Sequence, residues 1–138
     1  RLNTFLYADH GLDLYGNALI VRESFLEQNP ELVRGFVSAY LRGLQDTIRN
    51  PDESLAAVMQ LSQDGLMDQA QERDRLQIAL DSLYVSPEVE QNGLGGVDRA
   101  RLQKTLEQVA EGFGFANIPT PEEVFNDSFL PPKEQQTI

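Results

Sequence analysis

The chain has 138 residues, a length that suits one domain and would bury roughly two-thirds of the surface exposed by the unfolded chain. It contains no cysteine, which excludes disulfides, thiolate catalysis and thiolate-bound metals, and no apolar run approaches the roughly 18–20 residues that cross a bilayer. The net charge of -11 opposes binding to a phosphate backbone, and no cluster of Lys and Arg interrupts the acidic background, so we expect no nucleic-acid partner.

Two short apolar runs open the chain, at residues 4–8 and from Ala18 to Val21. Runs of this length are typical of strands buried on both faces. Two short strands do not make a stable sheet by themselves. Either the chain is helical throughout, or these strands pair with sequence outside it. Because the chain also starts at Arg1 and reaches the first run almost at once, we expect a piece of a longer protein.

The same helix-start signal occurs four times further along the chain. Each copy has a side chain that can accept a hydrogen bond from a helix N–H, then proline, then glutamate or aspartate. The copies are Asn29-Pro30-Glu31, Asn50-Pro51-Asp52, Ser86-Pro87-Glu88 and Thr120-Pro121-Glu122. Thr120 and Glu123 also form a capping box.

Apolar spacing completes the predicted helices. Residues 30–48 carry one broad stripe at three- and four-residue intervals, namely Val33, Phe36, Val37, Tyr40, Leu41, Leu44 and Ile48. Further helices are expected over about 51–61, over about 67–84, and from an Asp98 cap to Gly112 and Gly114, before a short capped turn over 119–126. We expect one domain, divided into a crossing-strand and ligand-side region (1–28), a helical part (29–127) and a disordered tail (128–138).

The segment Asp13-Leu14-Tyr15-Gly16-Asn17 stands between the two apolar runs and has the chemistry of a ligand-facing loop. Tyrosine offers an aromatic face and a hydroxyl, glycine lets backbone come close, and asparagine carries both a donor and acceptors for a planar polar ligand. We take Asp13, Tyr15, Gly16 and Asn17 as the predicted binding residues. The plainer interpretation is a strand-entry turn at Gly16-Asn17 with Tyr15 packed beside it.

The other candidate sites are weaker. His10 lies between Asp9 and Asp13, but this spacing defines no metal geometry, and a solvated polar turn explains it better. The glycine-rich loop from Asn92 to Val97 has neither of the common phosphate-binding spacings and is predicted to be a connector with positive φ angles. Carboxylates at Glu72, Asp74, Glu107 and Glu111 lie on helix faces where solvation is the ordinary role. We expect no catalytic residue, metal or cofactor.

Several motifs occur in the order typical of one protein family. They are Asp9-His10-Gly11-Leu12-Asp13, Tyr15-Gly16-Asn17, Leu19-Ile20-Val21 and Pro30-Glu31-Leu32-Val33, followed by Ser86-Pro87-Glu88-Val89, the stretch from Asn92 to Asp98, and Phe129-Leu130-Pro131-Pro132. With these motifs the chain resembles the NMT1/THI5-like substrate-binding proteins of bacterial ABC importers over nearly its whole length. The order of the motifs is more specific than any one of them.

The resemblance implies the C-terminal portion of a type II periplasmic binding protein. The expected fold is therefore mainly α with a short β element, part of one α/β lobe. It also implies a periplasmic or lipid-anchored extracytoplasmic protein that is not an enzyme. Such a protein captures a pyrimidine precursor, sulfonate, taurine or nitrate and delivers it to a permease driven by an ATPase. Because a lobe without its sheet partners exposes strand edges, strand exchange between copies is expected.

Two alternatives from other classes stay open. One is an enzyme of the thiamine-pyrimidine synthesis branch on the same fold, although the reactive histidine and cysteine cluster of those enzymes lies in a part absent from this chain. The other is a small helical interaction module that shares the motifs by chance.

Overall fold

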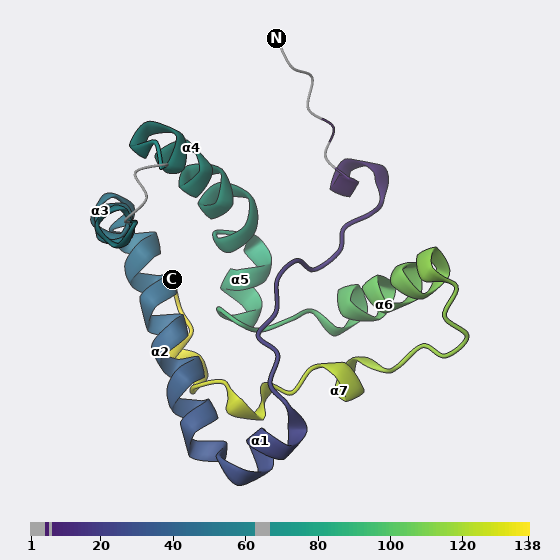
Figure 1. Ribbon diagram of the computed structural model, residues 1–138. Coiled ribbons are helices and arrows are strands. Elements are labelled where there is room, and N and C mark those ends of the chain that lie inside the picture. The colour runs from purple at the N-terminus through teal and green to yellow at the C-terminus, as the bar shows by residue number, and fades with distance from the viewer. Residues whose placement is uncertain (1–4, 6, 63–66) are drawn as a thin grey trace. The chain divides into compact units, whose positions relative to one another are not determined.

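The computed structural model describes residue 5, residues 7–62 and residues 67–138, and each regular element within these ranges is a helix (Figure 1). The prediction of a mainly α chain agrees with this structure. The predicted short β element, and with it the α/β lobe, is wrong, because no strand is present in the described ranges.

The two apolar runs predicted as strands have other conformations in the described residues. Tyr7–His10 forms a single 3₁₀ turn, η1, while Thr4 and Leu6 of the first run lie outside the described residues. Ala18 to Val21 has no regular structure and is exposed, with Ile20 93% accessible. An apolar run becomes a strand only when a neighbouring strand accepts its backbone hydrogen bonds and buries its side chains. Sequence pattern alone does not supply that neighbour.

The contacts of the chain group it into two compact units. Unit 1 comprises Arg1–Gln28 and Val97–Ser128, and unit 2 comprises Asn29–Gly96 and Phe129–Ile138. Each unit therefore combines segments that are far apart in the sequence.

Unit 2 is a set of helices, three of which begin at predicted proline start signals. They are α2 (Pro30–Arg49), α3 (Pro51–Leu61), α4 (Gln69–Ala79), the π-helix η2 (Leu80–Tyr84) and α5 (Pro87–Asn92). Proline begins α2, α3 and α5, where its missing N–H leaves no helical bond unmade. The α3 helix contacts both α2 and α4. The single helix predicted over 67–84 is instead α4 followed by the π-helical turn.

The α2 helix buries only part of its apolar stripe. Val33 and Leu41 are buried, whereas Phe36 is 59% and Tyr40 47% accessible. The rings of Phe36 and Tyr40 stack on each other, with centroids 6.4 Å apart. The stripe predicted from the spacing is therefore real, but unit 2 covers only one edge of it.

The C-terminal segment, η4 (Lys133–Gln135) and its neighbours, is packed in unit 2, so the prediction of a disordered tail is wrong. The buried Gln45 of α2 donates from Nε2 to the carbonyls of Gln135, at 3.0 Å, and Thr137, at 2.6 Å. Gln136 is also buried, and its carbonyl accepts from Leu94 N at 2.8 Å. These backbone partners order a segment whose polar composition is typical of a solvated tail.

Unit 1 is built around one long helix. It contains α1 (Glu23–Gln28), α6 (Arg99–Phe113) and the four-residue α7 (Pro121–Val124), which contacts α6; η3 (Asp127–Phe129) follows α7. The predicted Asp98 cap is confirmed, since Asp98 Oδ1 accepts from Arg101 N at 2.7 Å. Gly114 ends α6 with φ 71°, a left-handed conformation that favours glycine.

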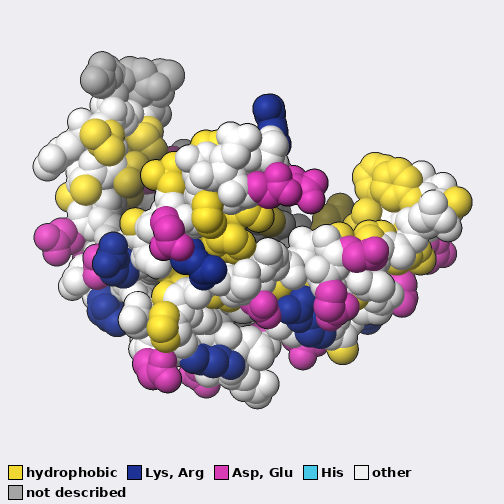
Figure 2. All heavy atoms as spheres, turned by 90° about the horizontal axis from the view of Figure 1, so that it is seen from below, with side chains coloured by type: hydrophobic (Ala, Val, Ile, Leu, Met, Phe, Trp, Pro, Cys, Tyr) yellow, Lys and Arg dark blue, Asp and Glu magenta, His cyan; other side chains and the backbone are white. Residues whose placement is uncertain are grey.

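Apolar side chains reach the surface alongside interleaved acidic and basic ones, as the face in Figure 2 shows. Exposed examples include Leu19, Leu32 and Phe113. Within the described ranges no helix is both long and apolar enough to cross a membrane.

The Gly93 turn generates a stability prediction. Gly93 has φ 79° and ψ 160°, a region that only glycine adopts readily, and a Cβ there would lie 2.5 Å from Gln136 Oε1. We expect Gly93→Ala to lower the free energy of unfolding by about 2 kcal/mol in urea denaturation followed by circular dichroism. Gly35→Ala is the matched control: it lies within α2 with nothing within 4 Å of a Cβ, and should be neutral or stabilising by up to about 1 kcal/mol. Equal effects of the two changes would contradict this role for Gly93.

The Asp98 cap at the start of α6 leads to a second stability prediction. Asp98→Ala removes the acceptor for Arg101 N and should lower the free energy of unfolding by about 1 kcal/mol. Asp98→Asn keeps an acceptor of the same shape and should cost only a few tenths of a kcal/mol. The same denaturation assay compares them, and a similar loss in both variants would show that the charge, not the cap, stabilises α6.

Candidate functional site

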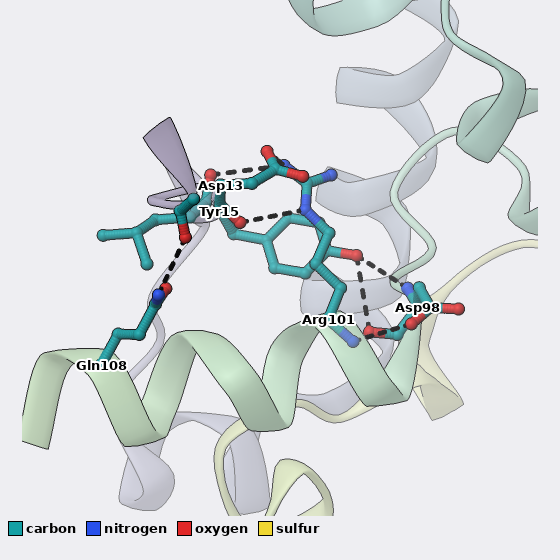
Figure 3. A network of polar contacts seen from close by, with 7 residues as sticks. Asp13, Tyr15, Asp98, Arg101 and Gln108 are labelled. Atoms are coloured by element: carbon teal, nitrogen blue, oxygen red, sulfur yellow. Dashed lines mark hydrogen bonds and ion pairs between the residues drawn. The ribbon is translucent and has the colours of Figure 1, made fainter. Parts of the chain in front are cut away.

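The predicted ligand loop meets the first turn of α6 inside unit 1, and Arg101 makes the contact (Figure 3). Arg101 Nη2 donates to Asp13 Oδ1 at 2.8 Å and to the Leu14 carbonyl at 3.4 Å, and Arg101 Nε donates to the Asp13 carbonyl at 3.3 Å. The Arg101 side chain is 30% accessible and that of Asp13 is 55%. The Arg101 guanidinium therefore binds both the Asp13 side chain and the backbone of the loop.

Tyr15 is fixed by the same turn of helix. Its ring lies under the Arg101 guanidinium, whose carbon is 4.3 Å from the ring centroid. The Tyr15 hydroxyl accepts from Asp98 N at 2.8 Å and lies 3.5 Å from the Asp98 carbonyl, to which it donates a long bond. A cation on the ring face contributes roughly 0.5–1 kcal/mol where the pair is partly solvated. The Tyr15 ring is thus held by Arg101, and its hydroxyl is held by the backbone of Asp98.

A second tie lies two turns further along α6. Gln108 Nε2 donates to the Gly11 carbonyl at 2.9 Å. Gly11 itself has φ 86°, so the chain turns there in a conformation that favours glycine. The loop over residues 11–15 is therefore attached to α6 through Gln108 and through Arg101 and Asp98 at its N-terminal end.

The four predicted site residues have different surroundings. Asp13 and Tyr15 are brought together by Arg101, which engages the Asp13 carboxylate and one face of the Tyr15 ring. Gly16 and Asn17 are exposed, and a Cβ added at Gly16 would meet nothing within 4 Å. Asp13 is also exposed and Tyr15 is half-buried, so three of the four predicted residues lie at the surface of the loop.

Sequence analysis missed Arg101 and Gln108, which lie far from the loop in the chain. One local signal pointed to Arg101. A cation in the first turn of a helix faces the positive end of the helix dipole, so its placement indicates an acidic partner elsewhere. No local pattern indicated that the partner would be Asp13, 88 residues away.

An open hollow of about 430 Å³ follows the loop in the sequence. It is lined by Ile20, Val21, Arg22, Ser24, Phe25 and Gln28. Apolar side chains from the run after Asn17 and from α1 thus form a shallow wall within unit 1.

The remaining candidates are placed as follows. The exposed His10 ring lies 6.4 Å from that of Phe5, and the described part of the chain has no group of three or more His, Cys, Asp or Glu residues suited to a metal ion. Gly93 and Gly95 have positive φ as predicted, and the amide between them, Leu94 N, donates to Gln136. That glycine loop is a connector packed by its own chain.

Comparisons with known proteins place the loop in a family. Residues 1–54, which include all four predicted site residues, match the family described as NMT1/THI5 like. The chain is 36% identical over 133 residues to the riboflavin-binding protein RibY of Chloroflexus aurantiacus, a match that covers 95% of this chain and 37% of that protein. No solved structure matches. The chain thus spans little more than a third of the length of this relative, and its likeness to the NMT1/THI5-like family lies in residues 1–54 and in this match.

Proposed function

We propose that this chain is part of a solute-binding protein that captures a small, neutral, planar nitrogen heterocycle of the flavin or pyrimidine type. The captured solute is delivered to an ABC permease and its ATPase. The protein works outside the cytoplasmic membrane, in the periplasm or held by a lipid anchor. The observation that carries the proposal is the 36% identity, over 95% of this chain, to a protein named for binding riboflavin.

The loop geometry supports a planar, hydrogen-bonding solute. Asn17 is exposed and has both a donor and acceptors, which match the alternating N–H and C=O edge of a pyrimidine or flavin ring. Gly16 lets the ring approach the backbone closely, because no side chain stands there. Since the loop is attached to α6 at Arg101 and Gln108, it binds with less loss of conformational entropy than a free loop would.

Electrostatics favour a neutral solute over the sulfonate and nitrate anions that the family resemblance also allows. Arg101, one of the cations near the loop, is paired with the Asp13 carboxylate at 2.8 Å and with two backbone carbonyls. The chain as a whole carries a net charge of -11. An anion would have to compete with Asp13 for the guanidinium inside a negative field.

Riboflavin fluorescence provides the direct test, because stacking and burial of the ring change its emission. The protein that carries this sequence is titrated with riboflavin and its 5′-phosphate, whose emission is followed directly, and with a pyrimidine, an alkyl sulfonate and nitrate, whose binding is followed by calorimetry. We expect saturable binding of riboflavin or the pyrimidine, weaker binding of the phosphate, and no binding of the sulfonate or nitrate. Saturable binding of the anions alone would contradict the proposal. Conversion of a bound heterocycle to a new product would instead support the alternative that this chain is part of an enzyme of the thiamine-pyrimidine synthesis branch.

Gly16 allows binding to be separated from folding. Gly16→Ala meets no neighbour within 4 Å and Gly16 has no positive φ, so we expect unchanged stability. A solute that packs on the Gly16 backbone would be displaced, and we expect about tenfold weaker riboflavin binding, equivalent to about 1.4 kcal/mol. Gly112→Ala, on α6 in the same unit and equally open, is the control that should leave affinity within about twofold. Unchanged affinity in both variants would place the solute elsewhere.

A further inference from the structure

The first turn of α6 carries positive charge at the end of the helix where the helix dipole disfavours it. After the acidic Asp98 N-cap it contains two cations, Arg99 and Arg101, although the N-terminal end of a helix disfavours positive charge. Each cation there costs roughly 0.3–1 kcal/mol unless a partner offsets it. Departures from local rules of this kind are often found at functional sites.

Both arginines have the same kind of partners but hold different segments. Arg99 Nη2 donates to Asp127 at 2.7 Å, and its guanidinium carbon lies 5.3 Å from the Phe125 ring centroid. Arg101 pairs with Asp13 at 2.8 Å and lies 4.3 Å from the Tyr15 ring centroid. Each guanidinium thus contacts carboxylate and carbonyl oxygens and one aromatic face; Arg99 also lies 3.9 Å from the Glu122 carboxylate. Arg99 holds the segment after α7, and Arg101 holds the loop of the proposed solute site.

We propose that Arg101 is the positioning residue of that site. It fixes Asp13 and Tyr15, so that the adjacent Gly16 and Asn17 are presented to the solute in one conformation. Its contacts with Asp13, Leu14 and Tyr15 engage the guanidinium within the chain, so it acts through the loop and not on the solute. The inference rests on the proposed function for its ligand, but the positioning itself is measurable without one.

Arginine is required for this arrangement because of its shape. The guanidinium is planar and forked, so its edge reaches the Asp13 carboxylate and two carbonyls while its face lies on Tyr15. A lysine ammonium keeps the charge but is a point donor without a flat face. Arg101→Lys therefore tests geometry at constant charge, and it is mild enough to keep the protein folded.

Hydrogen exchange gives the ligand-free readout. The Asp98 amide donates to the Tyr15 hydroxyl, so its exchange rate reports whether Tyr15 is in place. We expect about tenfold faster exchange of this amide in Arg101→Lys and little change in Arg99→Lys. Unchanged exchange in Arg101→Lys overturns the positioning proposal, whatever the protein binds.

Riboflavin affinity gives the functional readout, measured with the folded fraction followed by circular dichroism. We expect about tenfold weaker binding in Arg101→Lys and a change within about twofold in Arg99→Lys, the matched control from the same helical turn. Equal losses in the two variants mean that affinity follows the general stability of unit 1, which overturns the proposal.

A double-mutant cycle with Asp13→Asn shows whether Arg101 acts through the loop. If it does, Asp13→Asn and Arg101→Lys together weaken binding no more than Arg101→Lys alone. Additive losses mean that Arg101 contacts the solute or acts by another route, and the proposal fails. If the unmodified protein binds no riboflavin or pyrimidine while the Asp98 amide responds as expected, the proposed function fails and the positioning role stands.

Discussion

The ion pair between Arg101 and Asp13 is the interaction on which the arrangement of unit 1 around the site depends. It joins the first turn of α6 to a loop 88 residues earlier and brings the Tyr15 ring against the same guanidinium. The Asp98 cap stabilises this ion pair because its carboxylate accepts a hydrogen bond from the backbone N–H of Arg101. Because the pair is partly shielded and shares the guanidinium with carbonyls and a ring, it is more specific in geometry than a solvated surface pair.

Unit 2 achieves its order by a different route, through backbone carbonyls. Gln45 binds two carbonyls of the C-terminal segment, and the Gly93 turn accommodates Gln136 where a side chain would collide. Burial of apolar side chains is incomplete in both units. Leu32 and Phe36 of α2 are more than half accessible, and so are Leu19 and Ile20 in unit 1. The chain matches 37% of the length of its riboflavin-binding relative, so much of that protein has no counterpart here.

The electrostatic character of the site follows from these contacts. The exposed Gly16 and Asn17 and the pairing of Arg101 with Asp13 are the features that support the proposed neutral solute. The hollow beside α1 adds an apolar wall after Asn17.

The helices that begin at Pro30 and Pro51, and the helix capped by Asp98, were predictable because these signals act within one turn of backbone. The helix Glu23–Gln28 was not predicted. The sequence by itself also determined the family and the loop that contains Tyr15 and Asn17. Only the tertiary structure decided that Ala18 to Val21 forms no strand, that the C-terminal segment is ordered, and that Arg101 meets Asp13. Each of these depends on a partner distant in the chain, and neither periodicity nor capping chemistry specifies which distant residue supplies it.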